Sequence, residues 1–295
     1  MDRKNILEEI QRHVEILSSE HDTAFQYIPL HQRPSPSIQK IREIMLLMRS
    51  IVFPGFFGTM QEAQPQSITY YMGVHLESLF DLLSEQIFHG LCFESCGDCD
   101  GRARSQEITL AFIQQIPHIK HLLSTDVKAI LDGDPAAKSV SEIIFCYPAI
   151  HALLHQRVAH CLLKLGVPVL PRIITEMAHT DTGIDIHPGA QIGEYFSIDH
   201  GTGIVIGQTA IIGNHVRLYQ GVTLGAKSFT LDDAGLPIDV PRHPIIEDYV
   251  TIYSNASVLG RITIGKGSIV GGNIWLTYSV PENSRILQTN VNNAK

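Results

Sequence analysis

The sequence predicts an α+β protein, with an N-terminal α-helical domain followed by a C-terminal parallel β-helix. Three observations lead to this fold class. Aliphatic residues recur at every sixth position in the C-terminal third of the 295 residues, turn-forming residues fall between them, and residues 1–180 carry apolar side chains at helical spacing. The first two observations predict the β-helix, and the third predicts the helical domain.

The step of six appears in two runs that share one phase: Ile186, Ile192, Ile198, Ile204, Ala210, Val216 and Val222, then Ile246, Ile252, Val258, Ile264, Val270 and Leu276. A period of six is neither the 3.6 of a helix nor the 2 of a strand. It is the hexapeptide-repeat pattern of a parallel β-helix, in which three short strands form one coil of about 18 residues. The aliphatic residues are expected to point inward and to stack from coil to coil.

Turn residues lie between these positions, as in Pro188-Gly189, Gly213-Asn214 and Gly271-Gly272. Glycine and asparagine provide the positive φ that tight corners require. Residues 226–241 interrupt the repeat and are expected to form an inserted loop at one corner. Such loops often contribute to a binding surface.

Apolar spacing predicts helices in the first part of the chain. Ile6, Ile10 and Val14 indicate a first helix, and further helices are expected over 106–116, 124–132, 139–165 and 171–179, the third disturbed at Pro148. We therefore expect three segments: a helical domain at 1–181, a β-helix domain at 182–280 with the inserted loop at 226–241, and a flexible C-terminal tail at 281–295.

Composition excludes several classes of partner. The net charge of −8 argues against nucleic acid and against an anionic membrane surface. The N-terminal sequence MDRKNILEEI has no apolar segment of the kind found in secretory signals, and no run of about 18 apolar residues occurs. We expect a cytoplasmic protein that does not cross a membrane.

Five cysteines without a secretory signal do not predict a disulfide framework. Cys92, Cys96 and Cys99 are spaced closely enough for their thiolates to meet at a metal ion, but no obvious fourth ligand lies nearby. A cysteine-containing loop between helices is the alternative interpretation, and we assign no metal to the cluster. His151 and His155 are one helical turn apart and leave the same two interpretations open, a zinc site or a polar helix face.

The repeat region is rich in histidine, and His200 has the most informative neighbours. It follows Asp199 and precedes Gly201, so a ligand can approach it closely. An imidazole can accept a proton from a hydroxyl, and it does so best when a carboxylate orients its other nitrogen. Asp185 lies fifteen residues earlier, nearly one coil away. Arg242 offers a forked donor for a carboxylate. These residues predict an enzyme that acts on the hydroxyl of an amino or hydroxy acid.

The ordered motifs around these residues resemble serine O-acetyltransferases of the hexapeptide-repeat acyltransferase superfamily. The resemblance rests on Asp185-Ile-His-Pro-Gly-Ala-Gln-Ile-Gly, Asp199-His200-Gly-Thr-Gly, Gly221-Val-Thr-Leu-Gly and Arg242-His243-Pro244, and upstream on Asp134-Pro135-Ala136 and the segment from Ile150 to His160. It extends from about residue 130 to 275, and it implies a left-handed β-helix assembled as a homotrimer, with a dimer of trimers as an open alternative.

The resemblance implies transfer of an acetyl group from acetyl-CoA to the L-serine hydroxyl, giving O-acetylserine for cysteine synthesis. His200 would be the general base and Asp185 its partner. The substrate amino group would bind Asp134 and Asp199, and its carboxylate would bind Arg242 and His243. Acetyl-CoA would lie between two subunits, against Gly221, Gly225 and Ala226. Lys266, with Arg261, is a candidate for the CoA phosphates. No metal is expected.

The chain also departs from that family's pattern. Its inserted loop is long and acidic, and it lacks the terminal isoleucine with which many relatives bind O-acetylserine sulfhydrylase. We therefore do not predict that complex.

Three other functions remain alternatives. A γ-class carbonic anhydrase would need three histidines on a metal, and its His-x4-His spacing does not occur between residues 180 and 280. A non-catalytic scaffold would not require Asp185, His200 and Arg242 together. An acetyltransferase with homoserine or a sugar as acceptor is the third, and Arg242 favours an acceptor that carries a carboxylate.

Overall fold

The computed structural model describes residues 2–19, 35–57, 65–94 and 101–288. Residues 1–34 and 35–295 are two separate compact units, and each is described by itself. The first contains helix α1 (Arg3–Ser19), whose apolar residues are exposed within that unit. The second contains every other described element. The predicted division at residue 181 stays a prediction, although the chain does change from helix to strand between Thr182 and Asp185.

Six helices precede the strands in the described part of the second unit. They are α2 (Ile38–Val52), α3 (Pro65–Glu94), α4 (Gly101–Gly133), α5 (Val140–Cys146), α6 (Pro148–Lys164) and α7 (Leu170–Thr182). Serine side chains cap α2 and α5, where Ser37 and Ser139 accept hydrogen bonds from backbone amides. Gly183, in the left-handed conformation, ends α7.

Two helix predictions need correction. The segments predicted at 106–116 and 124–132 form the single helix α4, which continues through Pro117. Its buried positions keep their helical spacing across the proline (Phe112, Ile116, Ile119, Leu123, Val127 and Ile130), so packing outweighs the one lost hydrogen bond. The segment predicted at 139–165 is instead two helices, because the chain becomes extended at Tyr147, before Pro148.

Fourteen short strands follow in the described residues. They are β1 (Asp185–Ile186), β2 (Gln191–Ile192), β3 (Ser197–Asp199), β4 (Val205–Ile206), β5 (Ile211–Ile212), β6 (Arg217–Tyr219), β7 (Thr223–Gly225), β8 (Ile245–Ile246), β9 (Thr251–Ile252), β10 (Ser257–Leu259), β11 (Thr263–Ile264), β12 (Ile269–Val270), β13 (Trp275–Leu276) and β14 (Arg285–Ile286).

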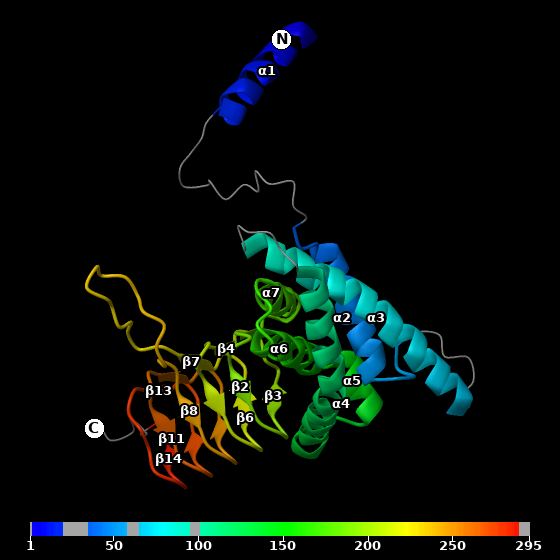
Figure 1. Cartoon of the computed structure of the whole chain (residues 1–295). Helices are drawn as coiled ribbons and strands as arrows, with labels where there is room; N and C mark the ends of the chain where they lie inside the picture. The colour runs from blue at the N-terminus through cyan, green and yellow to red at the C-terminus, as the bar shows by residue number, and fades with distance from the viewer. Residues whose placement is uncertain (1, 20–34, 58–64, 95–100, 289–295) are drawn as a thin grey trace. The chain divides into compact units, whose positions relative to one another are not determined.

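The strands form three parallel sheets, in the orders β1-β4-β7-β10-β13, β2-β5-β8-β11 and β3-β6-β9-β12-β14. We name them sheets A, B and C. Each coil contributes one strand to each sheet, which gives a parallel β-solenoid of about five turns, consistent with a left-handed β-helix. The predicted fold class is confirmed. Helices α4 and α6 contact β3, and α7 contacts β1, so the helices cover the first coil (Figure 1).

The first coil is longer than the predicted eighteen residues. Ile186 pairs with Ile206, twenty residues later, whereas Ile206 pairs with Leu224, eighteen residues later. The intervals from β1 to β3 match those from β4 to β6, so the two extra residues lie between β3 and β4. This is the corner that contains His200. The inserted loop then restores the original phase at Ile246.

The unbroken step of six therefore does not give the strand register of the second coil. The inward strand residues there are Ile206, Ile212, Leu218 and Leu224, while Ile204, Ala210, Val216 and Val222 are buried two positions earlier, near the corners. Each hexad thus contributes two inward residues rather than one. Of the thirteen predicted inward residues, only Ile192 is not fully buried.

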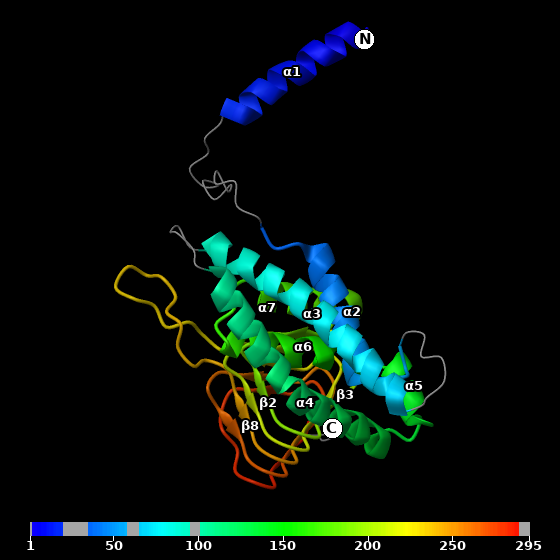
Figure 2. The same cartoon turned by 45° about the vertical axis from the view of Figure 1, so that its right-hand side comes forward.

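The chain between β7 and β8, residues 226–244, leaves the solenoid and contains the segment predicted as an insertion at 226–241 (Figure 2). A bridge between Leu231 and Pro237 closes its tip, and its side chains are largely exposed. The segment predicted as a tail differs from expectation, since Arg285–Ile286 forms β14 on sheet C. Residues 289–295 lie outside the described residues. Among the described residues, no helix is both long and apolar enough to span a bilayer.

Candidate active site

Five of the six predicted catalytic and substrate-binding residues lie at two corners of the coil, and Asp185 is the exception. The His200 corner consists of residues 199–204, between sheets C and A, together with Asp134 from the end of α4. The Arg242 corner consists of residues 187–190, 207–210 and 226–244, between sheets A and B. The strands of sheet A separate the two corners, and among the described residues no hydrogen bond or ion pair joins them.

His200 is held at its corner by an unusual backbone conformation. Its φ is +57°, and Gly201 and Gly203 also have positive φ values of 91° and 79°. This run turns the chain sharply and leaves the His200 side chain 73% exposed. Its Nε2 lies 3.8 Å from Oδ1 of Asp199. The imidazole is therefore open to a ligand and has a carboxylate beside it.

Asp134 reaches the same region from the end of α4. Its Oδ1 accepts a hydrogen bond from the Ala136 amide at 2.8 Å, and its Oδ2 accepts one from the Tyr147 hydroxyl at 2.7 Å. These bonds, the one from Tyr147 first, lower the pKa of Asp134, and the same bond raises the pKa of Tyr147 to about 12. Asp134 is thus a fixed, ionised carboxylate whose pKa is lowered further by the nearby charges of His200 and Arg217.

Asp134, Tyr147, Asp199 and Arg217 line one small pocket. The structure thus brings three predicted residues, Asp134, Asp199 and His200, to one place. Sequence reasoning missed Tyr147 and Arg217. Arg217 donates to the Gly133 carbonyl at 3.1 Å, so it anchors the end of α4 to sheet C. The only sequence signal for Tyr147 is its position before Pro148, which forces an extended residue between two helices.

Asp185 is not in contact with His200. No hydrogen bond or ion pair joins them in the described chain, and Asp185 instead lies near Glu176 and His179 of α7. Its backbone borders the His200 corner, because the Asp185 amide donates to Ile204 and the Gly203 amide to Gly183. The role of Asp185 as partner of the base remains a prediction.

Arg242 is positioned by the inserted loop. Its Nη1 lies 3.0 Å from Oδ1 of Asp239, its Nη2 donates to Oε1 of Gln208 at 2.7 Å, and its backbone amide donates to the Thr209 hydroxyl. Asp239 is exposed, and its bond to Arg242 is the largest cause that lowers its pKa. The guanidinium is therefore oriented by an exposed carboxylate, and the Arg242 side chain is itself only 21% exposed.

His243 is buried beside Arg242. Its Nδ1 accepts a hydrogen bond from the Thr209 amide at 3.1 Å, so its proton must be on Nε2. Burial, followed by the charge of Arg242, lowers the pKa of His243 to about 4. A Cβ on Gly207 would lie 2.1 Å from Nε2, so only glycine leaves room for this ring. His243 is a neutral donor at neutral pH.

The residues predicted to contact acetyl-CoA are divided between sites. Gly221 lies between sheets C and A, on the same edge of the solenoid as His200 but one coil later. Its amide donates a hydrogen bond to the Thr202 carbonyl. Gly225 ends β7 on sheet A, and Ala226 follows it. Lys266 lies at the corner between sheets B and C, with Nζ 5.6 Å from the Tyr249 ring. One chain therefore does not bring Lys266 to the glycines.

Three histidines of the repeat region lie apart from one another in the described chain. His187, His200 and His215 lie at three different corners, so no two of them can share an ion within the described chain. His151 and His155 stack with ring centroids 4.3 Å apart, and burial lowers the pKa of His155 to about 4. Glu176, His179 and Asp185 have ligand atoms within 4.8 Å of one another, and all three are partly exposed. Cys92 is buried in α3, and Cys96 and Cys99 lie outside the described residues.

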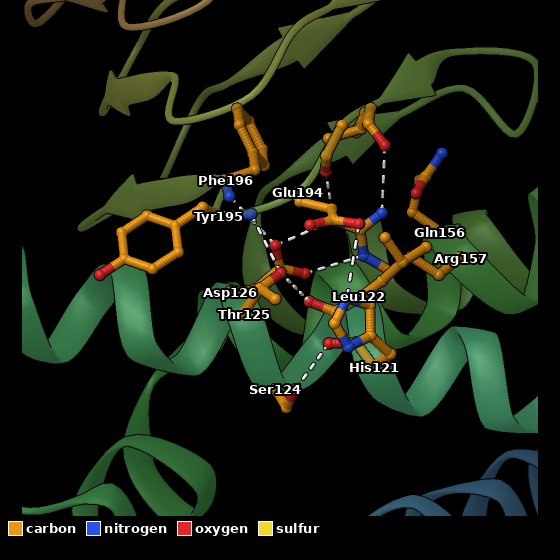
Figure 3. A network of polar contacts seen from close by, with 12 residues as sticks. His121, Leu122, Ser124, Thr125, Asp126, Gln156, Arg157, Glu194, Tyr195 and Phe196 are labelled. Atoms are coloured by element: carbon orange, nitrogen blue, oxygen red, sulfur yellow. Dashed lines mark hydrogen bonds and ion pairs between the residues drawn. The ribbon is translucent and has the colours of Figure 1, made fainter.

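A buried ion pair aligns the helices with the first coil (Figure 3). Arg157 of α6 forms two hydrogen bonds with Asp126 of α4, at 2.8 and 2.9 Å, and also donates to the carbonyls of Ile192 and Gly193. Asp126 accepts from the Phe196 amide at 3.1 Å. Since α4 leads to Asp134 and Phe196 leads through β3 to His200, the pair fixes the two halves of the His200 corner against each other.

Comparison with known proteins identifies the family of this chain. A plasmid-encoded serine acetyltransferase of Synechococcus elongatus is 49% identical over 266 residues, which are 88% of this chain and 83% of the relative. A serine acetyltransferase of Bacillus licheniformis is 45% identical over 166 residues, 56% of this chain and 73% of the relative. No family model matches the chain.

Solved structures agree. Entamoeba histolytica serine acetyltransferase 1, in complex with L-cysteine, superposes on this chain with a TM-score of 0.73 at 35% identity. The superposition covers 86% of this chain and 87% of the Entamoeba chain. Isoform 3 from the same organism, in complex with cysteine, has a TM-score of 0.72 at 33% identity, with 95% and 90% covered. Identity near one half over most of both chains, together with the shared fold, shows that this chain belongs to the serine acetyltransferase family of acyltransferase enzymes.

Proposed function

We propose that this chain transfers the acetyl group of acetyl-CoA directly to the hydroxyl of L-serine, with His200 as the general base. The observation that carries the proposal is the gathering of Asp134, Asp199 and His200 at one corner. Two carboxylates next to an exposed imidazole suit a substrate whose ammonium group lies within a few ångströms of a hydroxyl. Asp134, whose pKa is lowered, stays charged for the ammonium group.

The other end of serine would bind the Arg242 corner of a second copy. Arg242 presents two donors to a carboxylate, and the Nε2 proton of His243 is a third. Within one chain, sheet A separates this corner from His200, so the complete site needs two subunits. In a homotrimer whose threefold axis runs parallel to the solenoid axis, each His200 corner can face the Arg242 corner of a neighbouring subunit. Such a trimer contains three equivalent sites. This requirement supports a trimer and leaves further assembly of trimers open.

In the proposed reaction, Nε2 of His200 accepts the serine hydroxyl proton while the oxygen attacks the acetyl carbonyl carbon. The tetrahedral oxyanion then collapses, the carbon–sulfur bond breaks, and His200 returns the proton to the departing CoA thiolate. Asp185 would orient the imidazole after the exposed ring turns toward β1. Until then Asp199 is the nearest carboxylate.

Acetyl-CoA would lie along the outer side of sheet A, next to Gly221, Gly225 and Ala226. Gly225 has no side chain at an outward position of β7, so a co-substrate can approach the backbone there. Lys266 of a neighbouring subunit remains the proposed contact for a CoA phosphate.

A thiol-release assay with acetyl-CoA and a panel of serine, homoserine and a sugar tests the proposal. Serine should be the preferred acceptor, and His200→Ala should lower kcat by about 10²–10⁴-fold. His215→Ala is a matched control, because His215 also has φ +57° but lies at another corner. Near-normal turnover by His200→Ala would remove His200 from the mechanism, and turnover with homoserine or the sugar alone would change the acceptor.

A further inference from the structure

A second cavity lies between α2, α5, α6 and α7, with a volume of about 250 Å³. Tyr147 forms part of its wall and also lines the small pocket of Asp134, so the two spaces are neighbours divided by one residue. The apolar side of the cavity includes Phe53, Ile150 and Leu154. The proposed reaction uses none of these residues. The cavity is therefore a space of ligand size without an assigned occupant.

Arg49 provides a cation in this cavity. Its Cζ lies 3.5 Å from the centre of the Phe57 ring, and no carboxylate among the described residues lies within ion-pair distance of it. Burial lowers the pKa of Arg49, with no neighbouring acid to offset the effect. A partly buried guanidinium that lacks an anion is a strong binding group for a ligand carboxylate.

The cavity also contains an acid. Asp181 and His151 both line it, with Oδ2 of Asp181 3.3 Å from Nε2 of His151. That nitrogen is buried, and its geometry with Asp181 is not that of a hydrogen bond. Burial lowers the pKa of His151, and the charge of Asp181 offsets part of that effect. Since no hydrogen bond joins the two side chains, Asp181 can still accept hydrogen bonds from a ligand ammonium group. The cavity thus offers a cation, an anion and an apolar wall.

We propose that this cavity is a binding site for a free α-amino acid with an apolar side chain. Arg49 binds the carboxylate, Asp181 binds the ammonium group, and the side chain contacts Phe53 and Leu154. A purely anionic ligand would leave Asp181 unpaired, and a purely cationic one would leave Arg49 unpaired. Binding at this site does not depend on the proposed acetyl transfer.

Calorimetric titration of the full chain tests the proposal with three probes: L-leucine, 4-methylpentanoate, which lacks the amino group, and 3-methylbutylamine, which lacks the carboxylate. Leucine should bind at one site per chain and more tightly than either half. Arg49→Met, which keeps the packing on Phe57, should weaken leucine binding by about tenfold or more, and Asp181→Asn by a similar factor. Lys40→Met, a cation of α2 outside the cavity, should leave it unchanged.

Two further measurements separate this site from the substrate site and from a folding defect. Asp134→Asn should still bind leucine, because Asp134 does not line this cavity; loss of binding there would place leucine in the substrate site and overturn the proposal. Cys146 lines the cavity and is a free thiol. Leucine should therefore slow its modification by a small thiol reagent in the unaltered protein, as followed by peptide mass spectrometry. Equal rates with and without leucine, or equal affinity of Arg49→Met and the parent chain, would also overturn it.

Discussion

At the scale of single residues, the Tyr147 hydroxyl determines how Asp134 is presented. Tyr147 is fixed because it ends α5 and begins α6, and its hydroxyl donates to Oδ2 of Asp134 at 2.7 Å. The second oxygen of Asp134 is held by the Ala136 amide. A carboxylate held through both oxygens loses little freedom when it binds an ammonium group, which is how pre-organisation improves affinity.

Removing that hydroxyl should weaken substrate binding. Tyr147→Phe takes away one hydrogen bond to a charged group, with an effect of about 1.5–3 kcal/mol, or roughly 10- to 150-fold in the KM for serine. The value of kcat should change little, because the ammonium group is held equally before and during the reaction. Steady-state kinetics at saturating acetyl-CoA measure both constants. Tyr249→Phe, at another corner, is the control, and an unchanged KM in Tyr147→Phe would show that Asp134 needs no such support.

The position of candidate site residues could be predicted from the sequence where a motif contains them, as for Asp199-His200 and Arg242-His243. It could not be predicted where packing creates it. Nothing in the composition near Tyr147 distinguishes a residue that orients an acid from one that merely separates two helices. Likewise, nothing in the sequence distinguishes Arg217 from other exposed strand residues. In the structure it pairs with Ser197 and so lies opposite the end of α4.

At the scale of elements, the Asp126–Arg157 pair joins α4 and α6 to the first coil. Both side chains are almost fully buried, at 0% and 3% exposure. A buried pair of this kind adds little stability over apolar residues of similar volume, but it fixes one alignment of the elements it joins. The arrangement of α4 and α6 on the first coil therefore depends on both Asp126 and Arg157.

Asp126→Asn should destabilise the protein by about 3–5 kcal/mol, because it leaves the buried Arg157 charge without its partner. The double variant Asp126→Leu/Arg157→Met should regain much of this loss. Urea unfolding of Asp126→Leu, Arg157→Met and the double variant gives the coupling energy. Lys128→Met, which breaks the exposed pair of Lys128 and Asp132 on the same helix, should change stability by at most about 1 kcal/mol. Equal effects of Asp126→Asn and Lys128→Met would contradict the argument.

The lowered pKa of His155 in helix α6 leads us to expect a loss of stability in acid. Burial, followed by the charge of His151, lowers the pKa of His155 to about 4, against about 6.5 in an unfolded chain. As the pH falls from 6.5 to 4, the unfolded chain binds a proton that the folded chain does not, so His155 makes the fold less stable by about 3 kcal/mol over this window.

Urea midpoints at pH 7 and pH 4.5 measure this effect. His155→Leu should reduce the acid loss without abolishing it, since the pKa of His243 is also lowered to about 4 and acts in the same direction. His179→Leu, a partly exposed position on α7, should keep the full loss. A pH dependence identical in His155→Leu and in the parent chain would rule out the contribution of His155.

The sequence did not predict the strand register of the second coil, because two sets of aliphatic residues both fit a step of six. The step of six is satisfied by Ile204 and Ala210, yet the strands use Ile206 and Ile212, because both positions of each hexad face inward. Only the corner geometry, with two extra residues around His200, separates these registers. That extension is also what exposes His200, so the error in register and the exposure of the proposed base have one origin.

At the scale of the whole molecule, the division of the site between two corners has a consequence for assembly. His200 and Asp134 belong to one corner, Arg242 and His243 to another, and sheet A lies between them. We expect each complete site to take one corner from each of two neighbouring subunits. A substitution at one corner of a chain then leaves the other corner of that chain intact for the neighbouring site. Two inactive variants can then restore each other.

Co-expression of His200→Ala and Arg242→Ala chains with different tags should therefore give mixed oligomers with measurable activity. In a trimer that contains both kinds of chain, about one third of the sites combine an intact His200 corner with an intact Arg242 corner. The purified doubly tagged oligomer should show roughly that fraction of the parent kcat/KM for serine. His200→Ala mixed with Asp134→Ala is the control, because both changes affect the same corner and no intact site can form. Mixed oligomers that stay as inactive as their components would mean that each chain builds its site alone, and would remove the physical reason for a trimer.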